Sequence, residues 1–380
     1  MPRRHIAIFT LMGNGHLYPL LPLCAELTRR GYRVSCPANA HYSPQVRASG
    51  AEVIPFTDIP VDPALRKENA QRSSSHADDG GRFTTTQLEW QHFVCSNDAF
   101  LTQVEPCYAL NVPDLILYSR YCLPARLIAH RLRRPAVQLS PHFAYSGRSR
   151  FWDRGVHTNP PELVEYAHKV DSFLAGHGLP GTDHLWHIEA LNVHLLPRPF
   201  QYRDELFDDR FVFASSPLHR SFQPLWHAPR NGKPVVLISG YSGLPETWVL
   251  DTRYFHTIIA ALAEIDCHCV LSISDQVPTA ALGALPDNFE ITRTASHLEI
   301  LPRAALLICH AGMGSTLEAI YHGVPVLAVP ASPYTEEVGY RAAQLGVGKL
   351  LPRDSLSVDS VRSSVQQMLL DPELSERTES

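Results

Sequence analysis

The chain has 380 residues and a net charge of −5 at neutral pH, with 44% hydrophobic and 19% charged residues. This composition is typical of a soluble globular protein, and the length suggests two domains of ordinary size. There is no overall basic field of the kind that holds nucleic acid or an anionic membrane. The 20 histidines form no HExxH motif and no zinc-like cluster with cysteine, so we expect no bound metal.

The first residues, "MPRRHIAIFTLMGNGH", superficially resemble a signal peptide. The apolar run is short, however, and a glycine-rich loop interrupts it where a longer core and a cleavage site are needed. We interpret it as the first strand, and no run approaches the ~18 apolar residues of a membrane span. The eight cysteines are dispersed, and Cys267 and Cys269 form only C-x-C, so we expect reduced thiols and a cytoplasmic location.

The first half of the chain alternates strands and helices. The apolar runs "HIAIFTL", "YRVSCPA" and "AEVIPF" predict buried strands, with a helix from about Leu17 to Arg30 that Gly31 ends. Residues 59–86 lack a period and predict a long mobile loop. A helix over 87–110 follows, then strands at "PDLILYS" and "PAVQLSP". Strands separated by helices predict an α/β protein with a parallel, doubly wound sheet.

A proline-rich, polar segment, "SSPLHRSFQPLWHAPRNGKP", predicts a linker, after which the α/β pattern restarts. We expect strands at "VVLISG", "HCVLSIS", "NFEIT", "AALLICH" and "PVLAVP", and helices over about 252–263 and 315–321. The chain therefore contains two similar α/β halves in tandem. Ligands bind at the carboxyl ends of strands in such sheets, so two facing domains would form a cleft.

His16 lies in the loop "GNGHLYPLLPL", between the first strand and the first helix. A strand, a tight glycine-rich loop and a helix present a side chain at the carboxyl end of a sheet, where it can act on a ligand. The alternative is that His16 only helps to begin the helix.

The segment "ICHAGMGSTLEAIYHGVP" contains a second strand–turn–helix. His310, Gly312 and Gly314 make a compact turn, and Ser315 and Thr316 are expected to open the helix. Free N–H groups at a helix start, together with the helix dipole, suit a phosphate. The alternative is a capping box over "STLE", in which Glu318 folds back to the helix start without any ligand. The segment is neither a Walker P-loop nor GxGxxG.

The motifs "GNGHLYPLLPLCAELTRRGYRV" and "PDNFEI…HLEIL…CHAGMGSTLEAIYHGVPVLAVP" together resemble the macrolide-glycosyltransferase-like family of GT-B nucleotide-sugar glycosyltransferases. The resemblance implies a GT-B fold with two Rossmann-like, doubly wound domains facing across a cleft. An acceptor-binding domain would span 1–214, a linker 215–232 and a nucleotide-sugar-binding domain 233–380. The family usually continues into a crossover helix, which we expect to be missing because the sequence ends at "DPELSERTES".

The resemblance also implies roles for single residues. His16 would be the general base that removes the proton from the acceptor hydroxyl. The aspartate that usually orients this histidine corresponds to Ser119, which can hold an imidazole by a hydrogen bond but cannot stabilise an imidazolium as a carboxylate does. Arg120 follows it and would disfavour a protonated His16. Helix amides and polar side chains would stabilise the leaving diphosphate without a metal.

The expected contacts of the two substrates follow from the same resemblance. Glu318 would hold the ribose, Arg293 would stack on the base where Thr294 replaces the usual aromatic residue, and Glu336 with Glu337 would contact the sugar, unless the last two form only an exposed acidic loop. The full donor-binding set is Gly240, Ser242, Arg293, Ala295, His310, Gly312, Gly314, Ser315, Thr316, Glu318, Glu336 and Glu337. The acceptor-binding set is Asn14, Phe83, Trp90 and His142.

We therefore expect an inverting, metal-independent glycosyltransferase of antibiotic biosynthesis or self-protection. It would move sugar from a UDP- or dTDP-sugar to a hydroxyl of a small, largely apolar, macrolide-like natural product, with the nucleotide sugar as co-substrate and no further cofactor. The alternative is a non-catalytic relative that binds a nucleotide sugar or serves as a partner subunit, and Ser119 and the short C-terminus favour it. A sugar epimerase and a lipid-linked enzyme of cell-wall synthesis are further rivals, although the latter expects a basic membrane face.

Overall fold

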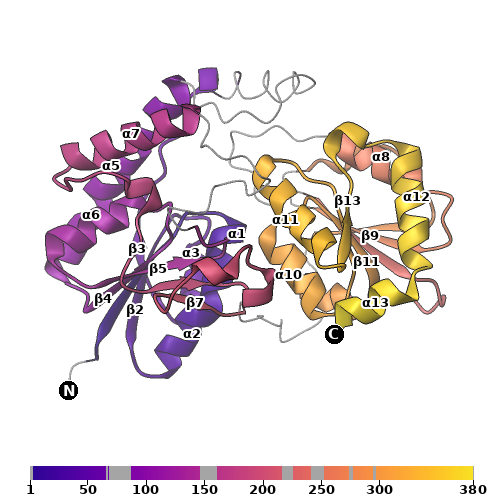
Figure 1. The fold of residues 1–380 in the computed structure, drawn as a ribbon, viewed down its shortest axis with the longest axis horizontal. Coiled ribbons are helices and arrows are strands. Elements are labelled where there is room, and N and C mark those ends of the chain that lie inside the picture. Colours follow the sequence, from indigo (N-terminus) through magenta and orange to yellow (C-terminus); the bar gives the residue numbers. More distant parts are fainter. Residues whose placement is uncertain are drawn as a thin grey trace. The chain divides into compact units, whose positions relative to one another are not determined.

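The computed structural model describes residues 3–65, 67, 87–145, 161–215, 226–240, 252–273, 277–293 and 297–379. The chain divides into two compact units, Met1–Pro217 and Leu218–Ser380, and each is described by itself. Each unit contains one sheet of parallel strands between helices, so the expected α/β class is confirmed (Figure 1). Most of the predicted loop over 59–86 and much of the predicted linker over 215–232 lie outside the described residues.

The first unit contains a seven-stranded sheet in the order β3-β2-β1-β4-β5-β6-β7. All of its strand pairs are parallel, so the carboxyl ends of all its strands lie along one edge. The order reverses between β1 and β4, and such a reversal is the point at which doubly wound sheets bind ligands. The strands are β1 His5–Phe9, β2 Arg33–Ala38, β3 Glu52–Pro55, β4 Leu115–Tyr118, β5 Ala136–Ser140, β6 Asn192–His194 and β7 Phe211–Phe213.

Helices cover both faces of this sheet. Ala7 and Phe9 of β1 pack among α5, α6 and α7, whereas Ile6 and Ile8 pack among the helices of the other face. Burial on both faces is the reason that β1 is a continuous apolar run. The helices are α1 Asn14–Leu17, α2 Leu21–Arg29, α3 Ser43–Ala48, α5 Gln87–Leu110, α6 Leu123–Leu132 and α7 Pro161–Gly176.

The predicted first helix is divided into three pieces. A 3₁₀ turn over Tyr18–Leu20 separates α1 from α2, with prolines in the first turn of both the 3₁₀ turn and α2. A proline nitrogen carries no hydrogen to donate, so the chain changes helix type there. Gly31 follows α2 with a φ of 89°, a left-handed conformation that suits glycine.

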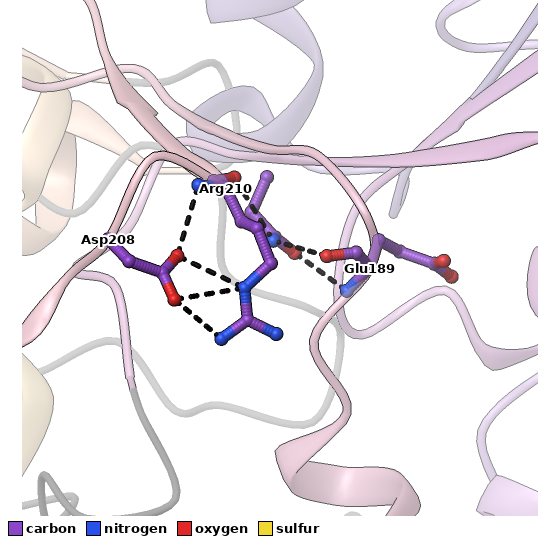
Figure 2. A network of polar contacts seen from close by, with 4 residues as sticks. Glu189, Asp208 and Arg210 are labelled. Atoms are coloured by element: carbon purple, nitrogen blue, oxygen red, sulfur yellow. Dashed lines mark hydrogen bonds and ion pairs between the residues drawn. The ribbon is translucent and has the colours of Figure 1, made fainter.

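A polar network fastens the last two strands of this sheet (Figure 2). Asn192, fully buried at the start of β6, exchanges hydrogen bonds with the backbone of Glu189 and also donates to the Arg210 carbonyl. The Arg210 guanidinium in turn pairs with Asp208, and this contact lowers the pKa of the Asp208 carboxyl. The network lies at the amino end of β6, and His194 lies at the other end of that strand.

The second unit contains a six-stranded parallel sheet in the order β10-β9-β8-β11-β12-β13. Its order reverses between β8 and β11, so it repeats the arrangement around β1 and β4 in the first unit. The predicted strands are confirmed to within two residues at each end. They are β8 Val235–Ser239, β9 His268–Ser272, β10 Phe289–Thr292, β11 Ala304–Cys309 and β12 Val326–Ala328, and the sequence analysis did not predict β13 Gly348–Leu350.

The helices of the second unit are α8 Thr252–Leu262, α9 His297–Ile300, α10 Met313–Tyr321, α11 Pro333–Gln344, α12 Val358–Leu369 and α13 Pro372–Glu379. Figure 1 shows α8 and α12 on one face of the sheet and α10 and α11 on the other. The last residues form α13, whose Leu374 is buried in the core of this unit with α8 and α12.

Two expectations concern the whole described chain. All eight cysteines are free, and the Cys267 and Cys269 sulfurs lie 3.5 Å apart without a bond between them. Among the described residues, no helix has the length and apolar character needed to span a membrane.

Candidate active site

His16 lies where β1 ends, beside the strand at which the sheet order reverses. Its backbone N–H donates to the Gly13 carbonyl at 3.0 Å, and this bond closes the first turn of α1. The glycine-rich loop therefore places the imidazole at the carboxyl edge of the sheet, as the sequence predicts.

The nearest polar partner of His16 is a second histidine. His142 Nε2 lies 3.3 Å from His16 Nδ1, and the two rings are 4.7 Å apart in an edge-to-face arrangement. His142 comes two residues after β5, so it occupies the same edge of the sheet. Tyr121 also places its ring edge-on to both, with centroids 6.5 Å from His16 and 5.8 Å from His142.

Both imidazoles are held in their neutral form. Burial lowers the pKa of His16 to about 4. Burial also lowers the pKa of His142 well below its ordinary value, and the neighbouring His16 and His194 lower it further. A neutral imidazole has one nitrogen that donates and one that accepts, so the pair can share a single proton between Nδ1 and Nε2.

A third histidine, His194, supports the pair from β6. Its Nδ1 donates to the His142 carbonyl at 2.9 Å, and the residue is only 1% exposed. Burial lowers its pKa to about 4. His194 was not predicted from the sequence because β6 has only three residues, although the run "LNVHLLP" shows the alternation that a short strand needs.

The structure corrects the role expected for Ser119. Its hydroxyl is fully buried and makes no hydrogen bond to any described residue, His16 included. Its backbone N–H donates to the Phe9 carbonyl, a bond that continues the pairing of β4 with β1 and holds the residue inside the unit. His142, which the sequence analysis assigned to the acceptor, makes the contact to His16 expected of position 119.

Arg120 does not act on His16 as expected. Its guanidinium lowers the pKa of His194, whereas burial is the cause of the low pKa of His16. The guanidinium stacks over the Tyr145 ring, 5.5 Å from the centroid.

Two of the other predicted acceptor residues have structural partners. Asn14 Oδ1 accepts a hydrogen bond from the Tyr42 hydroxyl at 3.0 Å. Trp90 stacks on Phe93 and lines a hollow of about 450 Å³ between α5 and α7, whose lining includes none of the three histidines. Phe83 lies outside the described residues.

The second unit presents its own turn at the carboxyl end of β11. Ala311 has a φ of 59°, an uncommon left-handed conformation for a residue with a side chain, and it bends the chain between His310 and Gly312. A Cβ at Gly312 would lie 2.7 Å from His310 Nε2, so only glycine lets the imidazole lie against the turn. Burial and, to a lesser extent, His297 lower the pKa of His310 to about 4.

The capping-box alternative for this turn is wrong. Helix α10 begins at Met313, two residues before the predicted start, and its N-cap residue Gly312 has no side chain to accept a cap bond. Ser315 is therefore the third helical residue, and Glu318 does not fold back but faces His297, with Oε2 3.7 Å from Nδ1. The first N–H groups of α10 have no intrahelical acceptor, since the helical pattern leaves these donors unpaired.

The polar side chains at this helix start differ in exposure. Ser315 is partly exposed, but Thr316 is fully buried and its amide donates to the Gly312 carbonyl. Burial raises the pKa of the neighbouring Cys309 thiol to about 12, and the Thr316 side chain lowers that pKa by a smaller amount. The Thr316 hydroxyl makes no hydrogen bond to any described residue, so its contact with a ligand stays a prediction.

The remaining donor residues predicted for the second unit have varied surroundings. Gly240 follows β8, at the position where the sheet order reverses, and a Cβ there would clash with the Phe255 ring. Arg293 donates to the Val277 carbonyl at 2.6 Å. Glu336 and Glu337 lie in the first turns of α11, so the alternative of an exposed acidic loop is wrong, and Glu337 is buried. Ser242, Thr294 and Ala295 lie outside the described residues.

Within the described ranges, no group of three or more His, Cys, Asp or Glu side chains is arranged to hold a metal ion. The turns after β1 and β11 offer imidazoles, backbone amides and hydroxyls. These groups can accept a proton and bind an anion.

Comparison with known proteins gives consistent similarities over the whole chain. Residues 256–380 match the family "Erythromycin biosynthesis protein CIII-like, C-terminal domain". The NDP-glycosyltransferase YjiC of Bacillus licheniformis is 30% identical, over 99% of this chain and 92% of that protein. The oleandomycin glycosyltransferase of Streptomyces antibioticus is 27% identical, over 98% of this chain and 85% of that protein.

A solved structure shows the same fold. The crystal structure of CalG4, the calicheamicin glycosyltransferase, superposes with a TM-score of 0.77 at 28% identity. The match covers 100% of this chain and 93% of that one. The expected GT-B architecture of two parallel-sheet units is confirmed by this similarity.

Proposed function

Since the chain belongs to the family of nucleotide-sugar glycosyltransferases that includes enzymes of macrolide biosynthesis, we propose that it is an inverting, metal-independent glycosyltransferase. The donor is a UDP- or dTDP-sugar. The acceptor is a hydroxyl of a small, largely apolar natural product of the macrolide or polyketide kind. The names found in the comparisons support this acceptor class, because the matched family is named after an erythromycin biosynthesis protein and one relative is an oleandomycin glycosyltransferase.

The observation that carries the proposal is the pair of turns at matching positions of the two sheets. His16 follows β1 at the strand reversal of the first unit, and His310 follows β11 at the strand reversal of the second. The first turn presents a base, and the second presents unpaired amides at the start of a nine-residue helix. A base in the first unit suits the acceptor hydroxyl, and helix amides in the second unit suit the diphosphate of the donor.

His16 acts as the general base in this mechanism. Its Nδ1–H donates to His142 Nε2, which leaves the Nε2 lone pair of His16 for the proton of the acceptor hydroxyl. This assignment of the proton is our own, because the 3.3 Å contact accommodates either direction of donation. As the new C–O bond forms, the positive charge spreads over two imidazoles instead of pairing with a carboxylate.

Bond formation and bond breaking occur at the same carbon. The acceptor oxygen attacks the anomeric carbon from the face opposite the nucleotide, the C–O bond to the diphosphate breaks, and the configuration inverts. The electron pair of that bond goes to the diphosphate, which the amides of Met313, Gly314 and Ser315 and the His310 imidazole stabilise. These donors carry out the stabilisation that a metal would otherwise supply.

A transfer assay tests the proposal. The protein is incubated with UDP-glucose and several UDP- and dTDP-sugars against a panel of hydroxylated aglycones, and glycosides are detected by mass. The His16→Ala variant is expected to lose turnover by ~10²–10⁴-fold while it still binds nucleotide. Equal transfer by wild type and variant would exclude His16 as the base. If a nucleotide sugar raises the melting temperature but is never consumed, the non-catalytic alternative is correct.

A further inference from the structure

Arg120 is a buried cation that has no anionic partner among the residues that the structure describes. The residue is only 8% exposed, and its side chain makes no hydrogen bond or ion pair with any residue that the structure describes. The guanidinium carbon lies 5.5 Å from the centroid of the Tyr145 ring, a cation–π contact. Arginines this buried are usually paired, because removing an unpaired charge from water is expensive.

Arg126, six residues later, shows the ordinary arrangement. It is also 8% exposed, but its guanidinium donates to the His184 carbonyl at 3.2 Å. The two arginines therefore lie in the same unit and are equally exposed, but only Arg126 donates a hydrogen bond to a described residue.

Among the described residues, the groups that act on the Arg120 guanidinium are phenols and another guanidinium, and none is a carboxylate. The groups that act on its pKa are Tyr118, Tyr121, Tyr145 and Arg126, and burial lowers that pKa most. The neighbouring histidines are influenced only by burial, by a carbonyl, by one another and by Arg120. Four strands that lie side by side in the sheet, β1, β4, β5 and β6, each have a basic side chain at or after their carboxyl end. These side chains are His16, Arg120, His142 and His194.

Unmet polar groups gather at the same strand ends. Thr10 follows β1 and Ser119 follows β4, and both hydroxyls are buried without a hydrogen-bond partner in the described part of the chain. The pairing of Phe9 with Tyr118 makes Thr10 and Ser119 neighbours on adjacent strands. Buried donors are normally satisfied, so an unsatisfied set at the ligand edge of a sheet indicates a missing acceptor atom.

We propose that Arg120 is a subsite for a carboxylate of the acceptor. The inference rests on the proposed function, because it names one chemical group of the molecule that the first unit binds. The planar guanidinium fork matches a carboxylate with two parallel N–H···O bonds, and the low-dielectric setting strengthens the pair. The neighbouring His194, on which Arg120 acts, has a lowered pKa and carries no charge that would compete for the anion.

Thermal unfolding with matched probes tests the subsite. Benzoate and its neutral isostere methyl benzoate are titrated against wild type, Arg120→Met and the control Arg126→Met, with inorganic phosphate as a further control. Benzoate is expected to raise the melting temperature of wild type and of Arg126→Met by about 2–4 °C at saturation. In Arg120→Met its affinity falls by ~10–100-fold, since a charge-assisted bond is lost.

Ligand-free stability separates a binding role from a structural one. Arg120→Met removes an unpaired charge, so its melting temperature stays at or above that of wild type, whereas Arg126→Met leaves a carbonyl unpaired and melts lower. A lower melting temperature for Arg120→Met, equal protection by methyl benzoate, or equal protection by phosphate would each overturn the assignment.

The two proposals fail in different ways. If a nucleotide sugar binds and is transferred but benzoate gives no protection that depends on Arg120, the transferase stands and the carboxylate subsite is wrong. If benzoate protects through Arg120 while no nucleotide sugar binds or is consumed, the anion site stands and the transferase proposal is wrong.

Discussion

His142 Nε2 lies 3.3 Å from His16 Nδ1, so an imidazole occupies the position behind the proposed base where the family usually has a carboxylate. A carboxylate would raise the pKa of His16 by favouring its charged form. A neutral imidazole fixes the ring by a hydrogen bond without that effect, and the pKa of His16 stays at about 4. The partner of His16 can therefore orient the imidazole without stabilising its positively charged form as a carboxylate would.

The first prediction concerns His142 as a positioning residue. His142→Leu removes the partner of His16 Nδ1 and should lower kcat by ~10–100-fold, because a misplaced base costs about this much. His142→Gln carries an amide that can still accept or donate there and should recover part of the rate. Steady-state kinetics check both variants, with Ser119→Ala as the matched control.

Ser119→Ala should lower kcat far less than His142→Leu does, because the Ser119 hydroxyl makes no hydrogen bond to His16 and cannot orient it. A large loss in Ser119→Ala together with normal turnover in His142→Leu would reverse the assignment of the orienting residue.

The second prediction is that kcat/KM does not fall near pH 6.5, where protonation of an ordinary histidine base would lower it. The base must be neutral, and the pKa of His16 is about 4 instead of 6.5. The value of kcat/KM should therefore be nearly constant from pH 7 to pH 5, whereas an unperturbed histidine would lose roughly 25-fold over the same range. Donor binding measured at the same pH values separates protonation of the base from weaker binding. A tenfold fall for each pH unit beginning near 6.5 would contradict the prediction.

The third prediction links His194 to stability. Its folded pKa of about 4 lies below its ordinary 6.5, so between these values the unfolded chain binds a proton that the folded chain does not. The free energy of unfolding consequently falls as the pH falls through this window, by up to about 1.4 kcal/mol for each pH unit from this residue. Above pH 6.5 this contribution is constant.

Denaturant unfolding of wild type and His194→Gln at several pH values isolates this contribution, since glutamine does not titrate. The stability difference between wild type and variant should shrink from pH 6.5 toward pH 4. A difference that does not change with pH would show that His194 has an ordinary pKa in the folded state.

The fourth prediction distinguishes two glycines of the second turn. Gly312→Ala puts a methyl group 2.7 Å from His310 Nε2 and should displace the imidazole, with a cost of ~1–3 kcal/mol and weaker dTDP binding. Gly314→Ala meets nothing within 4 Å and lies inside α10, so the folded protein should be as stable as wild type or more stable. Melting temperatures and nucleotide titrations compare the two variants.

Equal stability of the two alanine variants would contradict the packing of His310 against Gly312. If Gly314→Ala is stable but binds dTDP more weakly, the added methyl group stands where the diphosphate approaches, and this would support the proposed anion site at α10.

Several elements were predictable because their signal is local. The long helix α5 has the predicted bounds Gln87–Leu110, and the buried strands are continuous apolar runs in the sequence. The prolines of "LYPLLP" indicate an irregular helix start, although the division into α1, a 3₁₀ turn and α2 was not predicted. The three-residue strands β6 and β7 were missed, because so few residues carry no readable period.

The capping box shows a local motif that tertiary structure overrides. "STLE" has the right spacing for a box, but β11 ends at Cys309 and the left-handed Ala311 starts the helix at Met313. Ser315 is then too far into the helix to cap it. Whether a short motif can cap a helix depends on where the helix begins, and that in turn depends on where the preceding strand ends.

The sequence by itself determined the two parallel sheets, the glycine-rich turns, and the positions of His16 and His310 at strand ends, because each depends on neighbouring residues and on hydrophobic runs. Only the tertiary structure decided what surrounds His16. His142 is 126 positions away along the chain, and the lateral order of β1, β4, β5 and β6 brings it, Arg120 and His194 to one edge. Long-range packing also buries these side chains, and burial is the largest cause of their lowered pKa values.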